Sequence, residues 1–123
     1  MIPPIFHLMA ASAAVTGLVG TAPVRVFRAG RAPQDVVPPY MTWSTISDAS
    51  APDLDGGGPV HFRVQVNSFA RDEDECDELD SAAQAAIENG GENVNLGLSV
   101  DEVDQATGLY RMSRDFSLWV PQA

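Results

Sequence analysis

"VHFRVQVNSFA", residues 60–70, decides the fold, because apolar and polar residues alternate along it. Val60, Phe62, Val64 and Val66 fall on one side of an extended chain, and the polar residues between them fall on the other. This period of two predicts an antiparallel strand with one buried face. Such a face needs a cover, so helices are expected on that side of the sheet.

Further strands are predicted on both sides of this one, at residues 24–28, 40–47, 93–100 and 109–120. Two helices are predicted as well. The first, over residues 3–19, carries an apolar stripe at three- and four-residue steps. The second, over residues 72–89, begins with four acids, which the helix dipole favours there. The order predicts an α+β fold in one domain spanning residues 1–123, with an antiparallel sheet of about five strands and two helices packed on one face.

The stretch "APQDVVPPYMTW", residues 32–43, leads into the second strand. Its prolines lack the N–H that a central strand needs, so an extended surface segment is expected at the margin of the sheet. Tyr40 and Trp43 are expected to anchor it, one on each face of the strand. After that strand, residues 48–59 are rich in Asp, Gly and Pro and predict a flexible loop.

Aromatic and loop residues supply the candidate sites for protein contact. Trp119 falls opposite in parity to Phe116 and Leu118, which places it away from the main core. Exposed aromatics on a sheet often mark protein contacts, although a second sheet face covered by the chain itself explains them equally well. The candidate contact residues are Pro38, Pro39, Tyr40, Trp43, Asp53, Asp55 and Trp119.

The charge of the chain disfavours tight binding of nucleic acid. There are 17 acidic residues against 7 arginines and no lysine, which gives a net charge of −10. Binding of phosphates requires clustered basic residues. The apolar stretch 5–22 has no basic residue before it and is interrupted by polar residues, so neither a signal peptide nor a membrane span is favoured, and folding in the cytoplasm is expected.

Motifs for chemistry are weak. The loop "DLDGGG", residues 53–58, would need Glu at position 64 to resemble a calcium loop, and that residue is valine. The acidic run "DEDECDELD", residues 72–80, has no histidine nearby and is interpreted as a solvated helix start. Cys76 lies among acids, which disfavours a reactive thiolate. His7 and His61 have no identifiable partner, so no metal, cofactor or catalytic residue is predicted.

Four segments together resemble a known family: "MIPPIFHLMAASAAVTGLVG", "FRAGRAPQDVVPPYMTWSTIS", "VHFRVQVNSFA" and "TGLYRMSRDFSLWVP". They resemble the small tail-completion, or tail-terminator, proteins of long-tailed bacteriophages and related gene transfer agents. The resemblance implies an α+β subunit of a hexameric ring in the virion, without enzyme activity or cofactor. The ring would cap the major tail tube protein and meet the head-connector protein, while DNA passes through its lumen without specific binding. The resemblance also implies that residues 33–39 lie close to a subunit or tail contact and that the loop 48–59 becomes ordered on docking to the tail tube or the connector.

Two other functions stay open on the residues alone. One is a small acidic α+β protein-binding module that dimerises. The other is an enzyme with His61 or His7 as general base and a metal on the acidic helix, which ranks last because no site geometry can be assembled. The run at residues 72–80 is also more acidic than the resemblance leads one to expect, which leaves open whether this helix lines the lumen or the outside.

Overall fold

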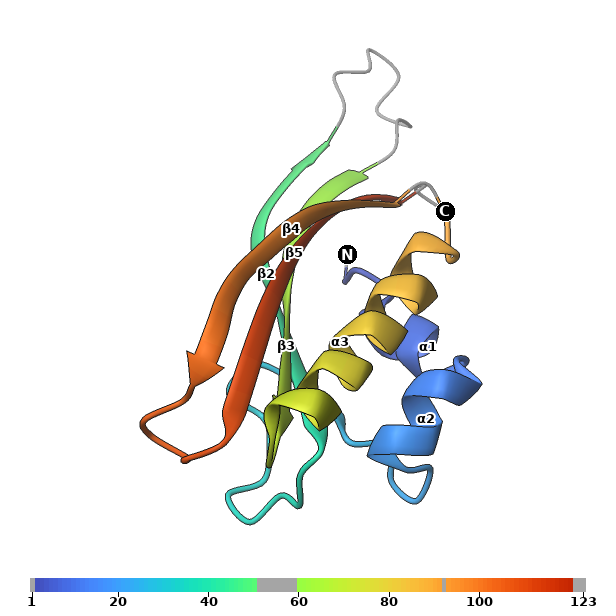
Figure 1. Cartoon of the computed structure of the whole chain (residues 1–123). Helices are drawn as coiled ribbons and strands as arrows, with labels where there is room; N and C mark the ends of the chain where they lie inside the picture. Colours follow the sequence, from blue (N-terminus) through green and yellow to red (C-terminus); the bar gives the residue numbers. More distant parts are fainter. Residues whose placement is uncertain (1, 51–59, 92, 121–123) are drawn as a thin grey trace.

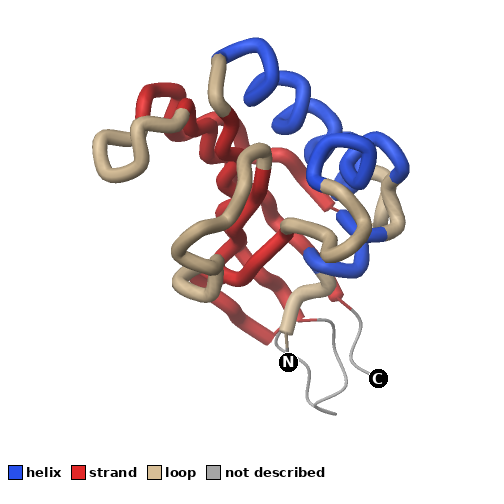
Figure 2. The backbone as a smooth tube through the Cα atoms, turned by 90° about the horizontal axis from the view of Figure 1, so that it is seen from below, coloured by secondary structure: helices blue, strands red, loops and turns tan. Residues whose placement is uncertain are grey.

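The computed structural model describes residues 2–50, 60–91 and 93–120, and it confirms the α+β class. Three helices lie on one side of a five-stranded sheet (Figures 1 and 2). In chain order the elements are α1 (Ile5–Ala10), α2 (Ala13–Val19), β1 (Val26–Arg28), β2 (Tyr40–Ser50), β3 (Val60–Ala70), α3 (Glu73–Glu88), β4 (Asn93–Val103) and β5 (Tyr110–Val120).

The strands are ordered β1-β2-β3-β5-β4 across the sheet. The four long strands pair with one another in antiparallel fashion, as predicted. The short strand β1 instead runs parallel to β2, with Val26 beside Met41 and Arg28 beside Trp43. A parallel pair requires the chain to return to the same end of the sheet, and the proline-rich residues 29–39 make that crossover.

The single helix predicted over residues 3–19 is wrong, because the chain forms two helices there. Ser12 lies between them with an extended backbone and accepts a hydrogen bond from the backbone N–H of Val15 at 3.3 Å. Serine competes with helical hydrogen bonds in this way and is favoured as an N-cap. The predicted apolar stripe still reaches the core, since Ile5, Met9, Val15 and Val19 are fully buried.

One hydrophobic core fills the space between the helices and the sheet. Phe62 of β3 and Phe116 of β5 are its largest fully buried side chains. The alternating residues predicted for the buried face of β3 all lie in it. The helices add Ile5, Met9, Val15, Val19, Leu79, Ala83 and Ile87, and the other strands add Val26, Met41, Trp43 and Leu118.

One boundary differs from the prediction for the link between β2 and β3. Strand β2 continues to Ser50, so residues 48–50 are strand rather than loop. Residues 51–59, the rest of the predicted flexible loop, lie outside the described residues. No helix in the described part of the chain is long and apolar enough to cross a membrane.

Candidate interaction surface

The sheet face turned away from the helices presents one exposed aromatic residue among polar ones. Trp119 is 42% exposed, and its ring lies 4.6 Å from the ring of His61 on the neighbouring strand β3. His61 shares a short hydrogen bond with the hydroxyl of Ser117. Arg63 pairs with Asp115 at 3.2 Å on the same face. Trp119 is therefore accessible to a partner, as its parity predicted.

Tyr40 and Trp43 point to opposite faces of β2, but both are buried within the subunit. The ring of Tyr40 stacks on Phe69 at 4.8 Å, and burial together with the charge of Asp104 raises the pKa of its hydroxyl. Trp43 belongs to the hydrophobic core, and the guanidinium of Arg28 lies 5.1 Å from the centre of its ring. Both side chains therefore hold the strand from inside and leave little surface for a partner.

The other candidate residues differ in their accessibility. Pro38 and Pro39 are half-buried, and the guanidinium of Arg25 donates to the carbonyl of Pro39 at 3.1 Å. This bond ties the end of the proline segment to the residue that precedes β1. Residues 33–35 and Val37 of the same segment are exposed, as expected for a surface segment. Asp53 and Asp55 lie outside the described residues.

A chain of hydrogen bonds links the four long strands across the face opposite the helices. The amide of Asn67 donates to the hydroxyl of Thr42 at 3.1 Å, and the hydroxyl of Ser113 donates to the side-chain oxygen of Asn67 at 2.5 Å. Ser99 of β4 donates to the backbone carbonyl of Ser113 at 3.2 Å. A shift of one residue would turn these side chains to the other face, so the chain fixes the register of the sheet.

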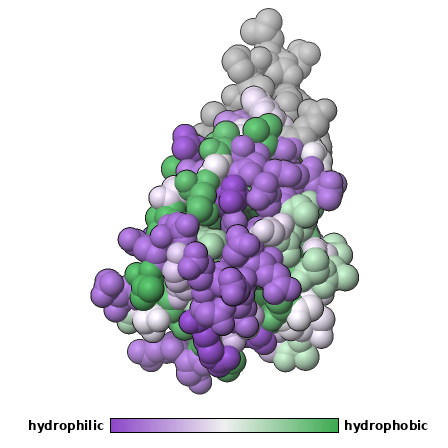
Figure 3. All heavy atoms as spheres, viewed as in Figure 1, coloured by the Kyte–Doolittle hydropathy of each residue, from purple (hydrophilic) through white to green (hydrophobic). Residues whose placement is uncertain are grey.

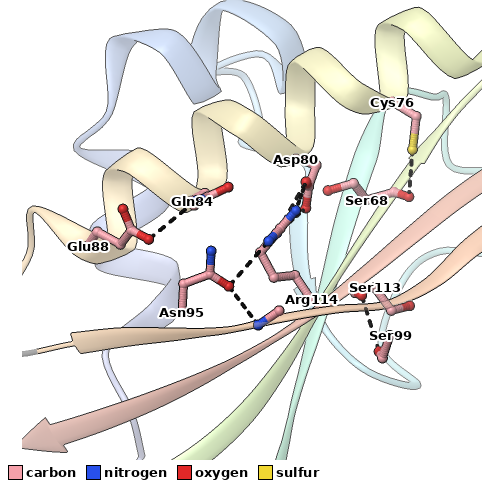
Figure 4. A network of polar contacts seen from close by, with 10 residues as sticks. Ser68, Cys76, Asp80, Gln84, Glu88, Asn95, Ser99, Ser113 and Arg114 are labelled. Atoms are coloured by element: carbon pink, nitrogen blue, oxygen red, sulfur yellow. Dashed lines mark hydrogen bonds and ion pairs between the residues drawn. The ribbon is translucent and has the colours of Figure 1, made fainter.

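The acidic helix α3 is tied to the sheet by a buried ion pair (Figure 4). The guanidinium of Arg114 contacts the carboxylate of Asp80 at 2.9 Å, and it also donates to the side-chain oxygen of Asn95 on β4 at 3.3 Å. Asp72 caps the helix by accepting from the N–H of Glu75 at 2.8 Å. The acidic run is thus mostly a solvated helix start, as predicted, but Asp80 is an internal partner of the sheet.

Within the described residues, Cys76 and His61 lie in different surroundings. Cys76 is fully buried, its thiol donates to the carbonyl of Ser68 at 3.2 Å, and burial raises its pKa to about 12. The imidazole of His61 meets a serine hydroxyl, but the nearby Asp115 bonds to Arg63 and Gln65 instead of orienting it. Among the described residues, no group of three or more His, Cys, Asp or Glu could hold a metal ion.

The family model described as tail completion protein gp17 matches residues 3–121, which is nearly the whole chain. The chain belongs to this family. Membership confirms the resemblance stated from the sequence and makes this tail completion protein a structural protein of bacteriophage-type tails.

The solved structures include a chain with the same fold, from the virion of a native gene transfer agent particle. The TM-score is 0.70 at 16% sequence identity, and the match covers 96% of this chain and 92% of that chain. At this identity the likeness is evidence for the fold alone. A comparison with curated proteins gives no match.

The sequence did not predict an apolar strip on β4 of the tail completion protein. Val94, Leu96, Leu98 and Val103 are all exposed, with Val94 at 54% and Leu96 at 48%. Figure 3 shows apolar patches along the margin of the molecule where β4 runs. The alternation of apolar residues in the sequence predicted the strand, but a strand that faces the core would show the same alternation. Only the strand order shows that β4 is an edge strand.

Proposed function

We propose that this tail completion protein is a tail terminator that assembles into a hexameric ring and caps the completed tail tube. The observation that carries the proposal is the family match over residues 3–121. One side of the ring binds the major tail tube protein, and the other side binds the head-connector protein. The protein is therefore a virion component at the head-proximal end of the tail, assembled in the host cytoplasm, and its role is structural rather than enzymatic.

DNA passes through the opening of this ring without specific binding. The net charge of −10 and the absence of lysine support this part of the proposal, because a negative surface repels phosphates. At the N-terminal end of α3, the N-cap Asp72 and the helix residues Glu73, Asp74, Asp77 and Glu78 are all exposed to solvent. A channel lined by such a surface lets DNA slide without being held.

Trp119 is the best of the candidate residues for contact with the tail tube or the connector. Its indole ring is exposed and held in place by His61, so it offers rigid apolar area to a partner at a small entropic cost. Pro38, Pro39, Asp53 and Asp55 remain candidate contacts, and in the sequence the two prolines precede β2 while the two aspartates follow it. Tyr40 and Trp43 support the contact from within the subunit.

Particles produced without this protein test the proposal. Their tails should be of irregular, mostly excessive length and should remain unattached to heads, and the wild-type protein supplied in trans should restore both properties. The purified protein should reach the mass of a hexamer by light scattering and form rings in negative stain, at high concentration or with tail tubes present. Normal tails without the protein would overturn the proposal. A stable dimer that forms no rings would instead favour a dimerising protein-binding module.

A further inference from the structure

The sheet has two open edges, and each has exposed apolar side chains. At one edge is β4, eleven residues long from Asn93 to Val103, with no proline, lysine or arginine in it. At the other edge β1 covers only residues 41–43 of β2. Within residues 2–50, 60–91 and 93–120, β2 from Ser44 to Ser50 therefore pairs on one side only, with β3. Exposed edges of this kind are templates for pairing with another chain.

The open part of β2 lies level with the end of β4 that begins at Asn93. The registers place Asn95 of β4 beside Phe116, Phe116 beside Val64, and Val64 beside Thr45 of β2. The four long strands also alternate in direction, so β4 runs opposite to β2. If copies of the subunit stand side by side in the same orientation, β4 of one copy meets β2 of the next as an antiparallel pair, which is the more stable kind.

The side chains at the two edges match in chemistry. One half of the sheet contains the start of β4 at Asn93 and the end of β2 at Ser50. In this half, Val94 and Leu96 of β4 are exposed, and Ile46 on the open part of β2 is 51% exposed. Pairing these edges would remove apolar surface of both copies from water. Val94 and Leu96 lie close together on one edge strand, and neighbouring exposed apolar side chains of this kind often mark a protein contact.

Charges are complementary in the other half of the sheet. Asp101 and Glu102 of β4 are exposed and give that half of the strand a negative edge. Near β1 lie three of the seven arginines, Arg25, Arg28 and Arg31, and the last two are exposed. In a protein with a net charge of −10 this is a local concentration of positive charge, and it favours the acidic end of another copy's β4.

Two bulges in β4 allow one strand to follow both parts of the opposite edge. The register shifts between Asn95 and Gly97 and again between Leu98 and Val100. Such shifts bend a strand. A bend is needed here, because β1 moves the lower part of the neighbouring edge outward by one strand spacing of about 4.8 Å.

We propose that β4 of one copy pairs with the open half of β2 of the next copy, so that the sheets join edge to edge around the ring. The contact is head-to-tail, since two different edges meet, and a contact of this kind forms a ring when the rotation from copy to copy closes. The inference rests on the proposed ring and names the surfaces that join its subunits.

Cysteine cross-linking tests this pairing in the full-length protein. Ile46→Cys combined with Leu96→Cys places one thiol on each edge. Within one subunit, strands β2 and β4 are three spacings or about 14 Å apart, whereas a disulfide requires Cα atoms at about 4.4–6.8 Å. Any disulfide between the two positions must therefore join two copies, and mild oxidation should give a ladder of covalent oligomers that ends at six. Ile46→Cys with Val94→Cys is tested in parallel, because a small shift in register changes which cysteine reacts.

The matched control is Phe6→Cys with Leu96→Cys. Phe6 is also an exposed apolar residue, 42% exposed, but it lies on α1, on the helical side. This pair should give no ladder, and the native Cys76 stays fully buried in all variants. Light scattering on the unchanged protein distinguishes failure of the edge pairing from failure of the proposed ring. A hexamer whose edge cysteines cross-link no better than the control overturns the edge pairing and leaves the ring intact. A protein that never assembles overturns both.

Discussion

Replacement of Arg114 by leucine should lower the free energy of unfolding by about 3 kcal/mol. The guanidinium makes contacts of 2.9–3.2 Å with the carboxylate of Asp80, whose side chain is only 6% exposed. Leucine would leave that carboxylate buried without its counter-charge. Breaking a buried pair costs roughly 3–5 kcal/mol, and the lower end applies because Arg114 itself is 17% exposed and partly reached by water.

Urea unfolding followed by tryptophan fluorescence measures this cost. With a slope of about 2 kcal/mol per M, a loss of about 3 kcal/mol moves the midpoint down by about 1.5 M. The measurement belongs at a concentration where light scattering shows the monomer, because assembly adds its own stability. Arg63→Leu is the matched control, since its pair with Asp115 is exposed and worth at most about 1 kcal/mol.

A double variant separates the ion pair from other effects of the substitution. Asp80→Leu with Arg114→Leu removes both charges and fills the space with apolar groups, which often recovers stability. The double variant should therefore be more stable than the sum of the two single losses predicts, by about 2 kcal/mol. The reasoning is refuted if Arg114→Leu costs no more than Arg63→Leu, or if the single losses add.

Three further variants test other parts of the structure. Ser12→Ala removes the cap of α2 and should cost about 1 kcal/mol in thermal unfolding, and an unchanged melting temperature would contradict the cap. The pKa of the Cys76 thiol is raised to about 12 from 9, so its contribution to stability is full below pH 9 and is lost as the pH rises toward 12. The urea midpoint of the wild type should thus fall more steeply than that of Cys76→Ala between pH 8 and pH 10.5, and parallel curves would refute this. Gly97 has a backbone φ of 113° in the bulge of β4. Gly97→Val should therefore lower the free energy of unfolding by about 1–3 kcal/mol, even though the added valine side chain would meet open space. A loss of stability no larger than that of a surface substitution would contradict the strained bulge.

Much of the fold could be predicted from local patterns. The alternation of residues 60–70 predicted β3 with its observed bounds, and the acids before Cys76 marked the start of α3. The break at Ser12 was missed because the residue also fits the apolar stripe of one long helix. Serine near the middle of a predicted helix, followed by a new apolar turn, is the signal that would have placed the cap.

The contact surface was less predictable, because it depends on pairing between distant segments. Tyr40 is buried because it stacks on Phe69 of another strand, and no local pattern encodes that contact. The apolar residues of β4 are exposed because no strand lies beyond it, and strand order is a property of the whole sheet. Trp119 was correctly placed away from the core, since its parity within one strand was sufficient.

The ladder between β3 and β5 also makes the subunit's resistance to an applied force depend on the direction of that force. It joins eleven residue pairs, from Val60 beside Val120 to Ala70 beside Tyr110, without a register shift. A pull on Val60 and Tyr110, at opposite ends of the ladder, loads all the hydrogen bonds at once in shear. The same pull on Val60 and Val120, at one end of the ladder, breaks the hydrogen bonds one after another. A subunit whose strands run along the tail axis would therefore resist tension along the tail far better than a force that peels its strands apart.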